Sequence, residues 1–163
     1  MKIRFAICED VPGILKLLQQ VDRVHHEGRP DLFRSNAQKY GPSQVFQMLE
    51  SSNQPIFVAV EGDKVLGYCF CQVKTIEENP VFYDRTELYI DDLCVDESCR
   101  RQGIAKMLYN EVLRYAKLRK CHHITLNVWS FNENAMGFYR SCGMKPQRVF
   151  METLLEDTYA GEK

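Results

Sequence analysis

Two adjacent carboxylates within an apolar segment are the first residues in this sequence that could do chemistry. Asp91 and Asp92 interrupt the apolar run 89–95. A carboxylate at a cleft can bind a cationic amine or accept its proton. Because neighbouring side chains of a strand point to opposite faces, we expect at most one of the two to meet the core. The alternative is structural: one carboxylate is solvated, and the other caps a turn or pairs with an arginine.

A basic turn with a glycine follows this segment. It consists of Arg100, Arg101, Gln102, Gly103, Ile104, Ala105 and Lys106. The turn stands where a predicted strand gives way to a predicted helix, so free N–H groups and the helix dipole would attract an anion such as phosphate. Gly103 and Ala105 allow close approach of the backbone, and the arginines add charge-assisted hydrogen bonds. The alternative is an ordinary turn with two solvated arginines.

A third segment, residues 127–139, combines polar and aromatic side chains at the end of another predicted strand. Asn132 is a suitable N-cap for the helix that follows, and Asn134 lies in its first turn. Phe138 is best interpreted as a core residue. Tyr139 has a hydroxyl that needs a partner if it is buried, which makes it a candidate general acid.

Apolar periodicity predicts the elements that position these three segments. Strands are expected at 2–7, 57–61, 64–74, 87–95 and 124–128, with one or two more within 144–155. Helices are expected from residue 11 onward and at 44–50, 103–119 and 132–141, with a largely irregular segment at 23–40. This order predicts an α/β (α+β) fold in a single domain, residues 1–163, with helices flanking a mixed, mostly antiparallel sheet.

Composition limits the possible partners. The 163 residues include 21 basic and 22 acidic side chains, for a net charge of -1, so we expect neither a nucleic-acid nor a membrane partner. No apolar run approaches the roughly 18 residues of a membrane span, and residues 1–5 do not resemble a signal peptide. The seven cysteines are odd in number and match no standard zinc spacing. We therefore expect reduced thiols, no metal site and a cytoplasmic location.

Taken together, these segments resemble the GNAT acetyltransferases. Residues 100–105 are similar to that family's acyl-CoA pyrophosphate loop, and residues 132–143, Asn-x-Asn-Ala-x-x-Phe-Tyr-x-x-x-Gly, to its later motif. The run 89–95 is especially similar to the spermidine/spermine acetyltransferase branch, which has Glu-Asp where this chain has Asp91 and Asp92. The order of elements matches over essentially the whole chain. The resemblance implies a GNAT-like fold with a β-bulge and splayed central strands.

The resemblance also implies how acetyl-CoA would bind. Backbone groups of Leu93, Cys94 and Val95 would pair with the pantetheine arm, in a slot that the bulge opens beside residues 124–128. Amides of residues 101–106 would bind the pyrophosphate.

Further along the chain, the resemblance implies that Asn132 and Asn134 line the other side of the cofactor and that Tyr139 faces the thioester sulfur. Two positions depart from the common pattern, since Arg101 and Ala105 stand where many members have glycine. Neither departure prevents backbone amides from reaching a phosphate.

The same comparison places residues 25–33 near the acceptor. His25, His26 and Arg29 are the residues of this segment that would shape an acceptor pocket. The alternative is a solvated loop anchored by Leu32 and Phe33.

The expected reaction is direct transfer of acetyl from acetyl-CoA to a primary amine, with CoA as the product. An alkylammonium has a pKa near 10.4, so only about one molecule in 2,500 is nucleophilic at pH 7, a cost of roughly 4.6 kcal/mol. We expect Asp91 to act as the base, directly or through water, and Asp92 to bind the substrate, although the reverse assignment stays open. Tyr139 would donate a proton to the departing thiolate.

A small, polyamine-like or other amino-compound acceptor is favoured, and other functions stay open. The acceptor could instead be a protein N-terminus or lysine, or the chain could be a non-catalytic sensor that binds acyl-CoA. A covalent intermediate on Cys94 or Cys99 is a further alternative, whereas the absence of Gly-x-Gly-x-x-Gly argues against a dinucleotide-binding domain. Residues 149–155 are apolar enough to pair across a homodimer interface.

Overall fold

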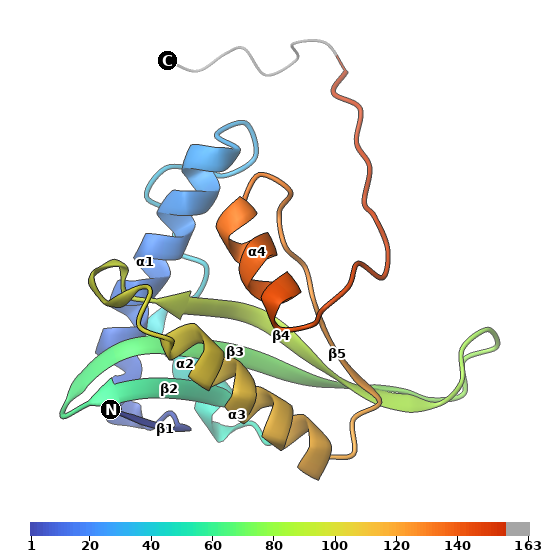
Figure 1. Ribbon diagram of the computed structural model, residues 1–163, viewed down its shortest axis with the longest axis horizontal. Coiled ribbons are helices and arrows are strands. Elements are labelled where there is room, and N and C mark those ends of the chain that lie inside the picture. Colours follow the sequence, from blue (N-terminus) through green and yellow to red (C-terminus); the bar gives the residue numbers. More distant parts are fainter. Residues whose placement is uncertain (156–163) are drawn as a thin grey trace.

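One mixed sheet of five strands forms the centre of the computed structural model, which describes residues 1–155 (Figure 1). The strands are β1 (Lys2–Phe5), β2 (Ile56–Glu61), β3 (Lys64–Ile76), β4 (Arg85–Val95) and β5 (His123–Leu126). They lie in chain order, antiparallel from β1 to β4, and β5 pairs parallel to β4. The prediction of a mixed, mostly antiparallel sheet is confirmed.

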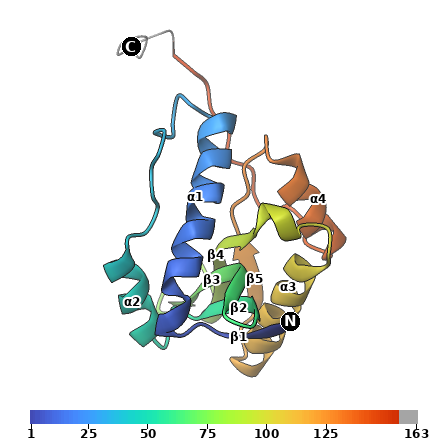
Figure 2. The same ribbon diagram turned by 90° about the vertical axis from the view of Figure 1, so that its left-hand side faces the viewer.

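Helices cover both faces of this sheet. They are α1 (Val11–Gly28), α2 (Pro42–Glu50), α3 (Ile104–Leu118) and α4 (Glu133–Ser141), with short 3-10 turns at Cys8–Asp10 and Glu97–Cys99. Figure 2 shows α1 and α2 on one side of the sheet and α3 and α4 on the other. Within residues 1–155, no helix combines the length and the apolar character that a membrane crossing requires.

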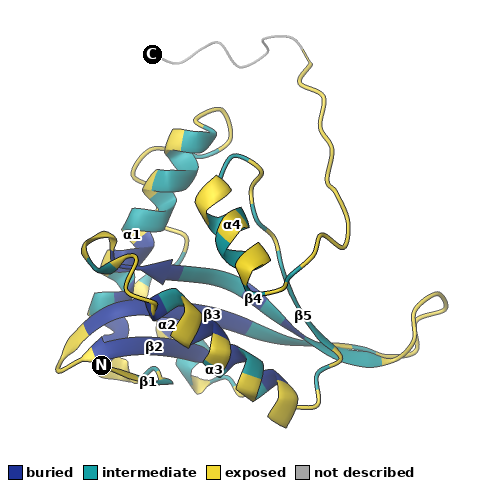
Figure 3. Cartoon of the chain, in the orientation of Figure 1, coloured by how far each residue is buried: buried dark blue, intermediate teal, exposed yellow. Residues whose placement is uncertain are grey.

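Two apolar clusters fill the space between the helices and the sheet. Because strand side chains alternate, Phe57 of β2 packs toward α3 and the next residue, Val58, toward α1. Both side chains are fully buried. Burial is concentrated in the central strands and on the inner faces of α1 and α3 (Figure 3). The sheet is therefore packed against helices on both of its faces.

The helix boundaries partly differ from those predicted. Helix α1 continues to Gly28, six residues into the segment 23–40 that lacks apolar periodicity. The start of α4 agrees with the sequence, because Asn132 Oδ1 accepts the Ala135 N–H at 3.1 Å as an N-cap. Gly143 follows the helix at φ +85°, the left-handed conformation that favours glycine.

The closing strands predicted within residues 144–155 do not form. In the described part of the chain, this segment leaves α4 and runs away from the sheet (Figure 1). Val149 and Phe150 are 75% and 97% exposed. Strand β5 consequently remains at the edge of the sheet. Although residues 144–155 are rich in apolar side chains, they do not pair with any strand in the described part of the chain.

Candidate active site

A β-bulge in β4 determines the geometry of the acidic pair. The register of β3 against β4 shifts once: Cys71 lies opposite Ile90, whereas Phe70 lies opposite Asp92. Asp91 is thus the extra residue of the bulge. A bulge interrupts the strict alternation of side chains and increases the local twist of the strand.

The bulge brings both carboxylates to the α1 side of the sheet. Asp91 Oδ2 accepts hydrogen bonds from the Tyr40 hydroxyl at 2.7 Å and from Lys39 Nζ at 2.8 Å. Asp92 Oδ2 accepts one from the Tyr68 hydroxyl at 2.6 Å, and Tyr68 belongs to the cluster under α1. The expectation that the two carboxylates point to opposite faces is therefore wrong, because it assumed a regular strand.

Partial burial makes Asp92 an unusual acid. Loss of solvation raises its pKa to about 6, even though the hydrogen bond from Tyr68 and the charge of Lys39 oppose the rise. Burial also raises the pKa of Tyr68, so the phenol remains a hydrogen-bond donor. A carboxylate that titrates near neutrality is suited to proton transfer at physiological pH.

Beyond the bulge, β4 continues without β5 beside it. Their pairing runs from Glu87 opposite His123 to Ile90 opposite Leu126 and ends one residue before Asp91. Strand β5 also ends at Leu126, and Figure 1 shows the chain that follows it leaving the side of β4.

The part of β4 that extends past the end of β5 has an open edge. Leu93, Cys94 and Val95 pair with β3 on one side, and within residues 1–155 no strand pairs with them on the other. An extended, amide-bearing molecule could add to this edge as a further strand would.

The turn before α3 presents a row of backbone N–H groups. Arg101 and Gly103 adopt positive φ angles of 65° and 80°, and the chain then enters the helix. The N–H groups of residues 101–106 have no backbone partner in the described chain, and that of Met107 makes the first helical bond, to the Gly103 carbonyl at 3.0 Å. Such a row at a helix N-terminus can bind a diphosphate.

Arg100 differs from its neighbours in this turn. Its N–H donates to the Glu97 carbonyl at 3.5 Å, and its Nε donates to the Val95 carbonyl at 3.4 Å. The side chains of Arg101 and Gln102 are exposed and make no hydrogen bond within the described residues. The guanidinium of Arg100 therefore contributes to the shape of the turn, while that of Arg101 is available to a ligand.

Tyr139 on α4 has an unpartnered hydroxyl. No hydrogen bond to it occurs among the described residues, and it is not sealed from solvent, since no fully buried side-chain polar atom lacks a partner there. Burial, with the nearby Cys69 and Asp92, raises the pKa of Tyr139. The phenol is thus held in its protonated form within electrostatic reach of Asp92, as a general acid requires.

Two further predicted cofactor residues lie at the start of α4. Asn132 uses its side-chain carbonyl oxygen as the helix cap, which leaves only its amide nitrogen for a ligand. Asn134 is exposed and makes no side-chain hydrogen bond within the described chain.

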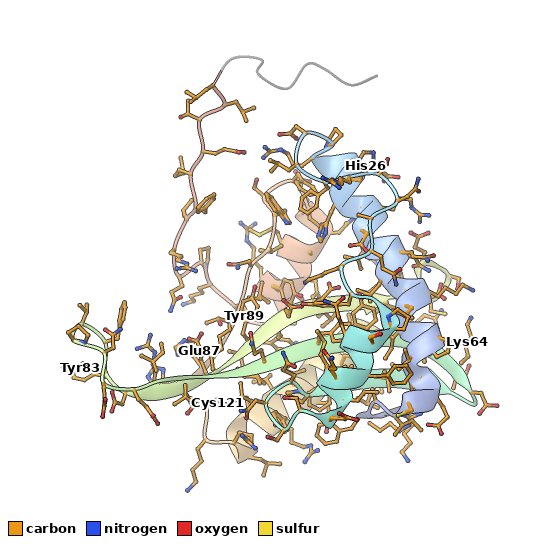
Figure 4. All side chains as sticks on the ribbon, turned by 180° about the vertical axis from the view of Figure 1, so that it is seen from behind. His26, Lys64, Tyr83, Glu87, Tyr89 and Cys121 are labelled. Atoms are coloured by element: carbon orange, nitrogen blue, oxygen red, sulfur yellow. The ribbon has the colours of Figure 1, made fainter. Side chains whose placement is uncertain are left out.

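The predicted acceptor residues lie at and just beyond the C-terminal end of α1, where Figure 4 labels His26. His25 stacks on Phe33 with ring centroids 5.0 Å apart, and His26 Nδ1 lies 2.7 Å from the Phe33 carbonyl oxygen. Arg29 forms ion pairs with Asp31 and Glu152. All three side chains already have partners within the chain, and none makes a hydrogen bond with the acidic pair.

Three residues of the site were not predicted from the sequence. Tyr68 lies in an apolar strand, where the one available signal was that a buried hydroxyl needs a partner. Tyr40 and Lys39 lie in the irregular segment between α1 and α2, where periodicity carries no signal.

Two cavities of the structure lie apart from the acidic pair, and neither is lined by Asp91 or Asp92. Both are shallow, of about 360 and 440 Å³, and border His122 and His123 at the start of β5. They lie toward the end of the sheet that carries Tyr83, away from His26 (Figure 4). We therefore locate the reactive site from the bulge, the open edge and the turn.

Comparisons with known proteins agree with this geometry. Residues 21–144 match the acetyltransferase (GNAT) family. A curated relative from Arabidopsis thaliana, GCN5-related N-acetyltransferase 6, chloroplastic, is 32% identical over 99 residues, which are 60% of this chain and 32% of that protein. The chain thus matches about a third of the length of this relative.

Solved structures share the whole fold. A mutant of the BH1408 protein from Bacillus halodurans superposes with a TM-score of 0.91 and 33% identity, over 95% of this chain and 99% of that one. Aminoglycoside N-acetyltransferase AAC(6')-Iy, solved in complex with CoA, has a TM-score of 0.71 and 15% identity, over 94% of this chain and 99% of that one. On the family match and the shared fold, the chain belongs to the GNAT family of acetyltransferases.

Proposed function

We propose that this protein transfers an acetyl group from acetyl-CoA to a primary amine by direct attack. The observation that carries the proposal is the β4 bulge, which turns Asp91 and Asp92 to one face immediately before the open edge of the same strand. A cation-binding carboxylate, a proton acceptor and a place for an extended thioester are thereby adjacent. These are the components that acetyl transfer to an amine needs.

The open edge and the turn are proposed to hold the cofactor. The pantetheine amides would pair with Leu93, Cys94 and Val95, and the pyrophosphate would bind to the N–H groups of residues 101–106. The guanidinium of Arg101 would add a charge-assisted hydrogen bond. The CoA complex of the aminoglycoside acetyltransferase, which has this fold, supports CoA as the ligand class.

For the acidic pair we propose the reverse of the roles expected from the sequence: Asp91 binds the substrate cation, and Asp92 accepts the proton. Asp91 already holds an ammonium group, that of Lys39. Asp92 has a pKa of about 6 because it is buried, which lies closer to the operating pH than that of an ordinary aspartate. The acceptor amine would then attack the thioester carbon, and an N–H of Leu93 or Cys94 would stabilise the oxyanion.

Tyr139 is proposed to protonate the sulfur as CoA leaves. Its hydroxyl has no partner in the described chain, and burial raises its pKa, so the proton is retained until a thiolate develops nearby. The retained Tyr139 and acidic pair argue against a sensor that binds acyl-CoA without turnover.

A small cationic amine with several amino groups is the proposed acceptor class. Two carboxylates on one face suit an acceptor with more than one positive charge, as polyamines and aminoglycosides have. A protein N-terminus or lysine is the second candidate, because the acidic pair would also attract a single cation.

An acceptor screen tests the proposal. The protein would be incubated with acetyl-CoA and a panel of polyamines, aminoglycosides, monoamines and peptides, with products identified by mass spectrometry. Acetylation of a small polyamine-like compound supports the proposal, and selective acetylation of peptides would move the assignment to the second candidate. Tight binding of acetyl-CoA with no turnover on any class would overturn it in favour of a sensor.

We also propose that the C-terminal arm, residues 145–155, pairs with a second copy of this chain. The arm exposes large apolar side chains along its length, namely Val149, Phe150, Met151, Leu154 and Leu155. Within residues 1–155, β5 is also an uncovered edge of the sheet. Two copies related by a two-fold axis could each lay an arm on the other's edge, which would cover both surfaces at once.

A further inference from the structure

Lys39 places a primary amine of this chain at the acidic pair. Its Nζ lies 2.8 Å from Asp91 Oδ2 and 3.2 Å from the Asp91 carbonyl oxygen. Burial raises the pKa of Asp92, and the charge of Lys39 opposes that rise, so the ammonium acts on both carboxylates. A lysine side chain ends in the same alkylammonium group as the proposed acceptors.

The surrounding contacts hold this ammonium in place. The Lys39 N–H donates to Asp22 Oδ2 at 3.0 Å, which ties the backbone to α1. The neighbouring Tyr40 donates its hydroxyl to the same Asp91 oxygen that Lys39 contacts. The Lys39 side chain is 33% exposed, so it is neither buried in the core nor free to move in solvent.

We propose that Lys39 is a self-acetylation site, and this inference rests on the proposed acetyl transfer. The Lys39 ammonium first loses one proton to solvent through Asp91, which it contacts, and the resulting amine attacks the thioester carbon. As the N–C bond forms and the C–S bond breaks, nitrogen loses its second proton to the Asp92 carboxylate, which releases it to solvent. The departing thiolate takes a proton from Tyr139, which solvent reprotonates, so one net proton is released. The products are acetyl-Lys39 and CoA.

An amine fixed within the site has an entropic advantage over any amine that must diffuse to it. Well-oriented intramolecular reactions reach effective concentrations far above those of dissolved substrates. Among the described lysines, Lys64 lies in the β2–β3 hairpin, at the far end of the molecule from Tyr83 (Figure 4), and makes no contact with the acidic pair. It is the matched control for unassisted chemical acetylation.

The test is a time course of the full-length protein with acetyl-CoA and no added amine. The protein would be digested with a glutamate-specific protease, and acetylation of Lys39 and Lys64 would be followed by mass spectrometry. We expect Lys39 to be modified at least about 100-fold faster than Lys64, with a first-order rate that does not change when the protein is diluted. The Lys39→Arg variant, which keeps the charge, should lose the modified peptide.

Two variants separate enzymatic from chemical modification. Tyr139→Phe and Asp92→Asn should each slow acetylation of Lys39 by at least about tenfold while leaving Lys64 unchanged. Equal rates for the two lysines, or a Lys39 rate unaffected by both variants, would overturn the inference. If an external amine is acetylated and Lys39 is not, only self-acetylation fails; if neither is acetylated, the proposed function fails with it.

Discussion

The Tyr68 hydroxyl donates a 2.6 Å hydrogen bond to Asp92 Oδ2, although the two residues lie 24 positions apart on adjacent strands. The contact exists because the bulge at Asp91 turns Asp92 toward the α1 side of the sheet, where Tyr68 is buried. The Asp92 carboxylate, which loses solvation in the folded state, thereby gains one strong hydrogen-bond donor. This bond does not fully offset the lost solvation, since the pKa of Asp92 is still raised, and the raised pKa affects both stability and catalysis.

Replacing Asp92 by Asn should stabilise the protein at neutral pH. Burial raises the pKa of Asp92 from 3.8 to about 6, so between these values the folded state binds a proton that the unfolded state does not. The free energy of unfolding therefore falls as pH rises through this window. Asn cannot ionise and can still accept from Tyr68, so Asp92→Asn should gain roughly 2–3 kcal/mol at pH 7.5.

Urea unfolding at several pH values measures this effect. The difference in unfolding free energy between Asp92→Asn and the wild type should shrink as pH falls and vanish only below the unfolded pKa of 3.8. Turnover should drop by about 10²–10⁴ because the base is gone. A variant that is less stable than the wild type at pH 7.5 would contradict the account of Asp92.

Tyr68→Phe should move the acidic limb of the pH profile in a defined direction. Burial raises the pKa of Asp92, and the Tyr68 hydrogen bond is the main influence that lowers it. Removing the hydroxyl should raise the pKa further, so kcat/KM would begin to fall at a higher pH than in the wild type. Titration of kcat/KM against pH measures the shift, and a shift toward lower pH would exclude Asp92 as the base.

Tyr139→Phe separates catalysis from cofactor binding. The Tyr139 hydroxyl makes no hydrogen bond in the described chain, so its removal leaves no partner unsatisfied. We expect turnover to fall by about 10²–10⁴ while CoA affinity, measured by calorimetry, changes little. Unchanged turnover would remove Tyr139 from the mechanism.

Ala105→Pro tests whether backbone nitrogens hold the pyrophosphate. The Ala105 N–H has no partner in the described chain, so proline at the second position of α3 breaks no helical bond. Helix α1 already has Pro12 at the equivalent second position. Loss of one charge-assisted hydrogen bond of about 1.5–3 kcal/mol should weaken CoA binding roughly 10- to 150-fold.

The matched control is Ala105→Ser, which keeps the N–H and should bind CoA nearly as the wild type does. Both variants would be checked by thermal unfolding, because a proline disfavours the helical conformation of the residue that precedes it. Wild-type affinity in a folded Ala105→Pro variant would move the diphosphate away from this turn.

Local signals in the sequence were sufficient for most of the fold. The alternation of Phe57 and Val58, the cap at Asn132 and the glycine at 143 depend on nearest neighbours and on strand or helix period. The parallel pairing of β4 and β5 is the arrangement that a connecting helix such as α3 favours. These features required no knowledge of distant contacts.

The site depends on features that lack such local signals. The bulge at Asp91 is one inserted residue in the pairing of two strands, and strict alternation predicted the wrong face for one carboxylate. The contacts of Lys39 and Tyr40 with Asp91 join segments about 50 residues apart. Their partners are determined by tertiary packing, which periodicity cannot detect.

The arm beyond α4 is the largest departure from the predicted fold, and it yields the last prediction. Phe150 is 97% exposed and Val149 is 75% exposed, so neither contributes to the core of its own chain. Phe150→Asp should therefore leave the thermal stability of the monomer unchanged within about 0.5 kcal/mol. If the arm covers the β5 edge of a second copy, burying a new charge at that contact should shift the protein from dimer to monomer.

Light scattering after size exclusion, at several protein concentrations, measures this shift. Phe150→Leu, which keeps an apolar side chain, is the control and should remain dimeric. A wild-type protein that is monomeric at all concentrations, or an Asp variant that dimerises equally well, would contradict the pairing.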